Sequence, residues 1–305
     1  MRCPSCPISK WHCCRSHRYV SKKWQDCNWV QALEGSIDTA HFTFAHLSFD
    51  KEENEILDIK KHFVNPIARM SSDHMRWIAE DPRPVIKIAA HAAGLTIAGG
   101  RLTGGDNIYW RIAQFLMPFH AYAPSAMPGE NIFGQTFVPV TDTNYWIYTY
   151  AWNPERPLTQ AERDVFDRGN GVIAEVGDNY VPLRHKGNDY LIDRKMQKTR
   201  SYTGIKGVSE QDAAVQDSQG PIADRTREHL GPTDLGIMHF RKVVMELARA
   251  LQQGEPPPQA AHQDRHAVRS GACVTSKAKD LSAVMLERFG DVTGFVGRPR
   301  TAAAE

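Results

Sequence analysis

The chain has 305 residues, 37 of them Lys or Arg and 35 Asp or Glu, so its formal net charge is +2, and 41% of its residues are hydrophobic. This composition is typical of a globular protein with a buried core, and the balanced charge argues against a dedicated nucleic-acid binder, which would carry a basic excess. No apolar run approaches the roughly 18 residues that a membrane span requires, and basic residues interrupt the first 20 positions, so we expect neither a span nor a signal peptide, no membrane partner, and a cytoplasmic location.

The N-terminal segment 1–20 is expected to be irregular, because cysteine, histidine and basic residues crowd it without a helical or strand period. Five of the six cysteines lie within the first 27 residues. A disulfide framework would spread its cysteines along a small secreted domain, so these do not predict one. We therefore divide the chain into this Cys/His-rich segment and one domain over 21–305.

Apolar residues recur at three- to four-residue spacing from Trp24 to Ile37, which predicts an amphipathic helix. Segment 51–83 is polar and interrupted by prolines, so we expect loop with short helical turns. Three β-like runs follow, over 85–102, 107–119 and 133–152. The Gly-Gly-Asp-Asn sequence at 104–107 is typical of a hairpin turn, so consecutive strands should pair antiparallel.

The second half of the chain has a helical pattern. Thr159 and Glu162 have the spacing of a capping box, which predicts a helix start. Segment 167–201 is expected to be irregular, whereas 209–230 and 233–252 predict two helices separated by Gly231 and Pro232. A proline-rich connection over 253–261 and a short helix over 277–289 complete the chain. The order indicates an α+β fold in which helices cover one face of an antiparallel sheet.

One segment combines two histidines with a carboxylate: Asp38 precedes His41 by three residues, and His46 follows His41 by five. On a regular helix Asp38 and His41 share a face. The two imidazoles would point about 140° apart, so they meet at one ion only if the helix unwinds or takes a π-type turn between them. Phe42, Phe44 and Leu47 are expected to shield the site from bulk water.

A carboxylate cluster formed by Glu210, Asp212 and Asp217 lies at the start of a predicted helix far along the chain. Two histidines and one remote carboxylate form the ligand set of non-haem Fe(II) oxygenases, which leaves coordination positions open for oxygen and substrate. Zinc with the same ligands is an alternative, although the sequence has no His-Glu-x-x-His hydrolase motif.

Two long stretches resemble a known family: NWVQALEGSIDTAHFTFAHLS (28–48) and SEQDAAVQDSQGPIADRTREHLGPTDLGIMHFR (209–241). They resemble the large (alpha) subunit of Rieske-type aromatic ring-hydroxylating oxygenases, in the group of phthalate 4,5-dioxygenase and related O-demethylases. The likeness runs from about Ser21 to the C-terminus. It implies a helix-grip catalytic domain, in which an antiparallel sheet wraps against a long C-terminal helix and a pocket lies between them.

The resemblance also assigns roles to individual residues. It implies that His41, His46 and Asp212 are the ligands of a mononuclear Fe(II), and that Asp38 bridges the first histidine to the electron donor. For Asp217 a solvated helix position is the expected role. Glu34 stands near a position that is polar and close to the metal in several relatives.

By the same resemblance, the chain is an oxygenase subunit that uses O₂ to hydroxylate or O-demethylate a phthalate-like aromatic acid. Its electrons would come from an NAD(P)H-dependent reductase, and the subunits would form a homotrimer. A carboxylate substrate requires an arginine with a bidentate fork, and the candidates are Arg69, Arg101 and Arg111. The aromatic residues Tyr145 and Trp146 are expected to lie in the sheet core.

Members of this family begin with a Rieske domain that holds a [2Fe–2S] cluster through Cys-x-His and Cys-x-x-His. Cys14-Arg-Ser-His17 matches only the second motif in spelling, so we predict no Rieske cluster within this chain. A zinc knuckle formed by Cys3, Cys6, Cys14 and His17 is an alternative for this segment. An alternative function follows, that of a catalytically impaired helix-grip domain that only binds iron or an aromatic ligand.

Overall fold

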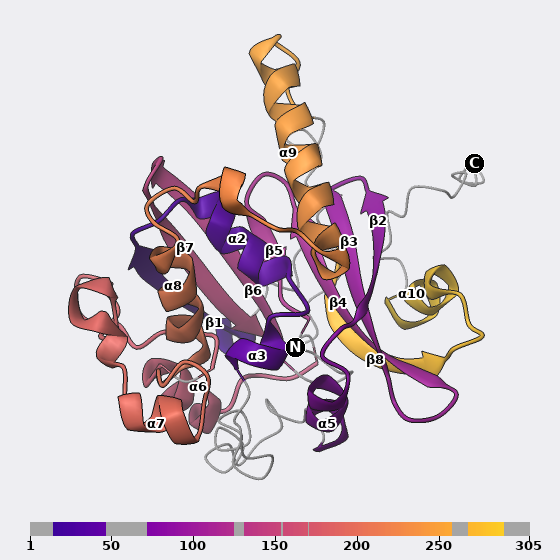
Figure 1. Ribbon diagram of the computed structural model, residues 1–305, viewed down its shortest axis with the longest axis horizontal. Coiled ribbons are helices and arrows are strands. Elements are labelled where there is room, and N and C mark those ends of the chain that lie inside the picture. The colour runs from indigo at the N-terminus through magenta and orange to yellow at the C-terminus, as the bar shows by residue number, and fades with distance from the viewer. Residues whose placement is uncertain are drawn as a thin grey trace.

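The strand-forming runs of the sequence pair into one antiparallel sheet (Figure 1). The computed structural model describes residues 15–46, 72–124, 131–153, 155–169, 171–257 and 268–289. Within these ranges the strands follow the order β1-β7-β6-β5-β4-β3-β2, and β8 pairs with β4. The strands are β1 (Arg18–Gln25), β2 (Val85–His91), β3 (Gly94–Leu102), β4 (Asn107–Leu116), β5 (His120–Tyr122), β6 (Ile132–Thr141), β7 (Asn144–Trp152) and β8 (Gly271–Ser276).

The sheet divides at β4. One edge of β4 pairs with β3 along its whole length, and the other edge pairs with β8 in its first half and with β5 in its second half. The hairpin expected between the first two β-like runs is confirmed as the β3–β4 pair. Two of the predicted runs are each two strands, because tight turns divide them after His91 and after Thr141.

Helices flank the sheet (Figure 1). They are α2 (Trp29–Ile37), α3 (Phe42–Ala45), α5 (Ser72–Glu80), α6 (Gln160–Asp167), α7 (Arg194–Thr199), α8 (Val208–Ser218), α9 (Leu235–Gln252) and α10 (Leu281–Phe289), together with 3₁₀ turns η1 (Arg15–His17), η3 (Lys186–Leu191), η4 (Arg225–Arg227) and η5 (Pro232–Asp234). The capping box at Thr159 is confirmed at the start of α6. No helix in these ranges combines the length and apolarity that crossing a bilayer requires.

The main hydrophobic core lies between the sheet and helices α2 and α9. Leu33 and Ile37 of α2 and Phe240 of α9 are fully buried against Ile97 and Phe115 of the sheet. Burial of such side chains contributes about 1.5–3 kcal/mol each, so this core holds α2 firmly on the sheet. The long C-terminal helix α9 and the α+β class are therefore confirmed.

Several details of the predicted fold are wrong. The helix predicted over 209–230 ends at Ser218, because Gly220 and Pro221 follow it. Strand β1 begins at Arg18, inside the segment 1–20 that the sequence predicts to be irregular. Helices do not keep to one face, because β3 alternates its side chains: Ile97 packs toward α2, whereas Ala98 packs toward Val284 of α10 on the opposite face. The helix predicted from Trp24 begins only at Trp29, since Trp24 belongs to β1 and pairs with Trp146 of β7.

Candidate metal centre

The chain turns sharply after α2, and this turn positions the first histidine. Asp38 ends the helix in an extended conformation, and its carboxylate accepts hydrogen bonds from the backbone N–H groups of Ala40 and His41, at 2.7 and 3.1 Å. The expectation that Asp38 and His41 share a helix face is therefore wrong, because this turn, and not helical periodicity, brings them together. The carboxylate oxygen Oδ2 lies 3.2 Å from His41 Nδ1.

The two histidines flank a single helical turn. His41 immediately precedes α3, and His46 immediately follows it. The backbone N–H groups of Phe44 and Ala45 both donate to the carbonyl of His41, so the turn closes without a π-type distortion. The imidazole rings of His41 and His46 face each other through their Nε2 atoms, which lie 3.2 Å apart.

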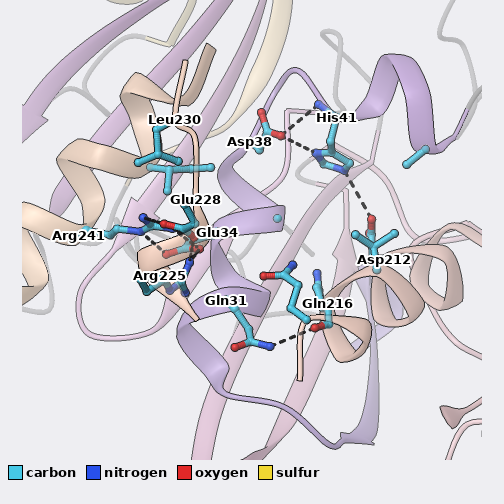
Figure 2. A pocket seen from close by; sticks show the side chains of 15 residues that line it. Gln31, Glu34, Asp38, His41, Asp212, Gln216, Arg225, Glu228, Leu230 and Arg241 are labelled. Carbon is cyan, nitrogen blue, oxygen red and sulfur yellow. Dashed lines mark hydrogen bonds and ion pairs between the residues drawn. The ribbon is translucent and has the colours of Figure 1, made fainter. Parts of the chain in front are cut away.

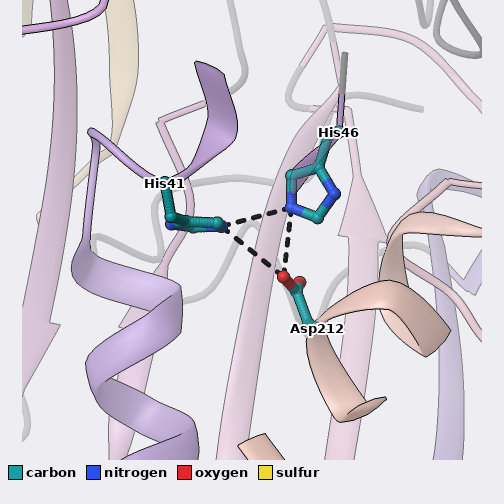
Figure 3. A group of neighbouring side chains, drawn as sticks. All are labelled: His41, His46 and Asp212. Carbon is teal, nitrogen blue, oxygen red and sulfur yellow. Dashed lines mark hydrogen bonds and ion pairs between the residues drawn. The ribbon is translucent and has the colours of Figure 1, made fainter. Parts of the chain in front are cut away.

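Helix α8 brings the carboxylate to the histidines across 166 residues of sequence. Asp212 Oδ1 lies 3.0 Å from Nε2 of His46 and 3.5 Å from Nε2 of His41 (Figure 3). Ligand atoms that sit about 2.1 Å from one cation are separated by roughly 3.0–3.4 Å, so the triangle fits a single metal ion. Among the described residues, no other three histidine, cysteine or carboxylate side chains form such a group.

The carboxylates beside His41 favour a cation in the site, whether a proton or a metal ion. Burial alone would lower the pKa of His41, but the carboxylates of Asp212 and Asp38 raise it to about 10. Burial would raise the pKa of Asp212, yet His46 and His41 hold it well below its ordinary value. A cation that binds here displaces the proton of His41 and meets an ionised carboxylate.

Around the ligands, aromatic shielding is only partly as predicted. The Phe42 ring packs against His46 with a centroid separation of 5.2 Å, whereas Phe44 is half exposed and faces Tyr202. Leu47 lies outside the described residues, as does Arg69, and so do three residues of the zinc-knuckle alternative: Cys3, Cys6 and Cys14.

The two remaining candidate arginines lie on neighbouring strands but have different surroundings. Arg101 of β3 is fully buried, and its guanidinium donates to the carbonyls of Thr39 and Asp81, at 2.6 and 3.2 Å. Arg111 of β4 is also buried, and its guanidinium carbon lies 4.4 Å from the centre of the Phe42 ring. Among the described residues, Nε and Nη1 of Arg111 have no hydrogen-bond partner.

A cavity of about 240 Å³ lies between α2, α8 and α9 and has Asp38, His41 and Asp212 in its wall (Figure 2). Neither Arg101 nor Arg111 lines it. The cavity therefore adjoins the metal-binding turn on a side that includes neither Arg111 of β4 nor Phe42 of α3.

Glu34 also lines this cavity, but it does not join the ligands. Its carboxylate binds Arg241 of α9 at 2.7 Å and Arg225 of η4 at 2.8 Å, and both arginines also bind Glu228 (Figure 2). These four side chains tie α2 to α9 beside the metal-binding turn.

Asp217, which the sequence predicts to be solvated, is buried. It accepts hydrogen bonds from the hydroxyl of Tyr190 and from Gln25 Nε2, the latter at 3.1 Å. Tyr145 lies in the core as expected, while Trp146 of the same strand packs its ring on Trp24.

Most of the chain is similar to known proteins. Residues 7–287 match the family described as "LigXa C-terminal domain like". The chain belongs to this family. It is 31% identical to the 3-chlorobenzoate-3,4-dioxygenase oxygenase subunit of Comamonas testosteroni over 278 residues, which are 86% of this chain and 60% of that protein. It is 32% identical to the phthalate 4,5-dioxygenase oxygenase subunit of Pseudomonas putida over 243 residues, 77% of this chain and 52% of that protein.

The predicted resemblance to Rieske oxygenase large subunits is thereby confirmed. The chain spans between about half and three fifths of the length of these two relatives. Among solved structures, it is similar to a Pseudomonas putida CBB5 NdmA variant with caffeine, at 12% identity and a TM-score of 0.44 over 86% of this chain and 58% of the other.

Proposed function

We propose that this chain is the catalytic domain of a Rieske non-haem iron oxygenase that hydroxylates or O-demethylates an aromatic carboxylic acid. The observation that carries the proposal is the meeting of His41, His46 and Asp212, whose ligand atoms lie 3.0–3.5 Å apart although Asp212 is 166 residues from His46. Two imidazoles and one carboxylate are the donors that non-haem Fe(II) oxygenases use.

Three side chains of this domain would hold the metal. Bound Fe(II) would supply O₂ activation by electron transfer. The side chain of His46 is 1% exposed, which keeps water from its ring, whereas the side chains of His41 and Asp212 are about 30% exposed. The buried ligand anchors the site, and the two exposed ligands face the side from which ions and electrons arrive.

Asp38 would position His41 and connect it to the electron donor. Its carboxylate oxygen Oδ2 lies 3.2 Å from Nδ1 of the imidazole and would take the Nδ1 proton, so that Nε2 of the same ring remains free for the metal. Asp38 also lines the cavity between α2, α8 and α9. We place the donor at this cavity: a Rieske centre of a neighbouring subunit in a homotrimer, reduced by an NAD(P)H-dependent reductase.

Arg111 would bind the substrate carboxylate. Its guanidinium is buried, has two nitrogens without a partner among the described residues, and lies over Phe42, whose ring contacts His46. A guanidinium fork is suited to bidentate binding of a carboxylate. The names of the two relatives refer to 3-chlorobenzoate and phthalate, both aromatic carboxylates. Arg101, whose bonds go to backbone carbonyls, would instead hold the Thr39 turn, and Arg69 remains a candidate from sequence alone.

The proposal is tested with the full chain loaded anaerobically with Fe(II) and supplied with either hydrogen peroxide or a reductase and a Rieske partner protein. Phthalate and 3-chlorobenzoate are the probes, and their amides, which lack the carboxylate, are the matched controls. We expect hydroxylated product from an acid and none from its amide or from Asp212→Ala. Iron and acid binding without product in either electron supply would instead support the domain that only binds.

A further inference from the structure

The two histidines of the metal-binding turn have different partners at Nδ1. His41 faces the carboxylate of Asp38, whereas Nδ1 of His46 lies 2.7 Å from Oε1 of Gln211 on α8. Both side chains of the second pair are buried, with His46 3% and Gln211 1% exposed. Water therefore does not compete for this hydrogen bond. The Gln211 amide faces Nδ1 of His46, while Asp212 Oδ1 lies 3.0 Å from Nε2, the nitrogen that faces the metal position.

A second contact fixes the orientation of the Gln211 amide. Its Nε2 donates to the backbone carbonyl of Ile205 at 2.8 Å. A carbonyl oxygen only accepts hydrogen bonds, so the nitrogen end of the amide must face Ile205 and the oxygen end must face His46. Because Oε1 also only accepts, the proton of this hydrogen bond has to come from Nδ1 of His46.

We propose that Gln211 is a positioning residue that fixes His46 with its proton on Nδ1 and thereby aims the Nε2 lone pair at the metal. The inference rests on the proposed metal site. Two consecutive residues of α8 therefore act on the site: Asp212 supplies a ligand atom, and Gln211 orients His46, which lies 165 residues earlier in the chain.

As a neutral amide, Gln211 orients His46 without adding a negative charge to the site. His41 already has the Asp38 carboxylate as its partner, and Asp212 brings a further negative charge to the same few ångströms. A carboxylate at position 211 would add another charge in the buried part of the site, which costs free energy unless it is paired. The two histidines therefore receive one charged and one neutral acceptor.

The test uses 15N-histidine-labelled full chain at pH 8–9 and its Gln211→Leu and Gln211→Glu variants. The matched control is Gln216→Leu, which removes a buried amide from the same helix that bonds Gln25 and the carbonyl of Ala32 but no histidine. Long-range 1H–15N correlation spectra of the metal-free proteins show which nitrogen of His46 carries a proton, and titration with Co(II) gives the metal affinity.

We expect a proton on Nδ1 of His46 in the wild type, in Gln216→Leu and in Gln211→Glu. Removal of an outer partner of a metal ligand weakens binding about 10- to 100-fold, so Gln211→Leu should lose that much Co(II) affinity while Gln211→Glu recovers most of it and Gln216→Leu stays at the wild-type value. An unprotonated Nδ1 in the wild type would overturn the inference, even if the leucine variant did not fold. Equal Co(II) affinity of folded Gln211→Leu and wild type would also overturn it, whereas a wild type without Co(II) affinity would overturn the metal site itself.

Discussion

Replacement of Arg111 by methionine separates a substrate anchor from a structural arginine. Arg111 is buried, its Nε and Nη1 have no partner among the described residues, and its guanidinium contacts the face of Phe42 and the Tyr109 side chain but no carboxylate. A buried cation without a counter-charge costs several kcal/mol, and the contact with an aromatic face returns about 0.5–2 kcal/mol. Arg111→Met should therefore stabilise the ligand-free chain by about 1–2 kcal/mol.

The same change should weaken aromatic-acid binding. Hydrogen bonds to a charged group contribute about 1.5–3 kcal/mol each, so loss of a bidentate pair costs about 3–4 kcal/mol, or roughly 100- to 1,000-fold in Kd. Arg101→Met is the matched control on the next strand. It removes donors from the carbonyls of Thr39 and Asp81 and should destabilise the chain by about 2–4 kcal/mol.

Urea unfolding of the metal-free proteins measures the free energy of unfolding. Calorimetric titration with the aromatic acid that the wild type binds most tightly measures Kd. The reasoning predicts opposite signs for the two arginines in the unfolding experiment. It is refuted if Arg111→Met destabilises the chain as much as Arg101→Met does, or if it binds the acid as tightly as the wild type.

Three further predictions concern the surroundings of the site. Asp38→Asn should retain iron but lower donor-dependent turnover more than about 10-fold, because His41 loses its charged partner. Iron content and product formation test this prediction, and unchanged turnover would contradict it. Burial raises the pKa of Glu210 to about 7 from its ordinary 4.5, so its contribution to stability is present below pH 4.5 and is lost as the pH rises through 7. Glu210→Gln should remove this decline and unfold at higher urea concentration at pH 8, by up to about 3 kcal/mol; the same slope between pH 5 and 8 in both proteins would disprove it. Glu34→Gln breaks two partly buried ion pairs and should cost about 2 kcal/mol in urea unfolding, whereas Glu246→Gln, which breaks an exposed pair, should cost less than about 0.5 kcal/mol; equal losses would show that the contacts of Glu34 do not stabilise α2 on α9.

The sheet was predictable where alternation and turn residues agree, as at the β3–β4 hairpin. The β2–β3 turn was not, because Ala92 and Ala93 carry none of the glycine, asparagine or proline signals of a turn. The start of α2 was also misplaced. Trp24 fits the helical period equally well, and only its pairing with Trp146, more than 100 residues away, assigns it to a strand.

The residues of the triad were predictable because their motifs are local and resemble those of a family. The geometry of the site was not predictable. A turn that Asp38 caps brings the Asp38 carboxylate next to His41, and the helical period does not. Asp217 is buried against Tyr190 and Gln25, and Tyr190 lies in the segment 167–201 whose sequence predicts no regular structure. Gln211 gave no sequence signal as a partner of His46 either, since a glutamine in a helix is most often a surface residue.

The most direct test of the account is the iron content of the full chain after anaerobic Fe(II) loading and gel filtration. The wild type and His239→Ala should each retain about one iron per chain, because His239 is an exposed residue of α9 whose ring hydrogen-bonds to the carbonyl of Leu235 in the same helix. His41→Ala, His46→Ala and Asp212→Ala should each retain almost none. Iron retained at the wild-type level in folded samples of all three variants would contradict the claim that these residues hold one metal ion.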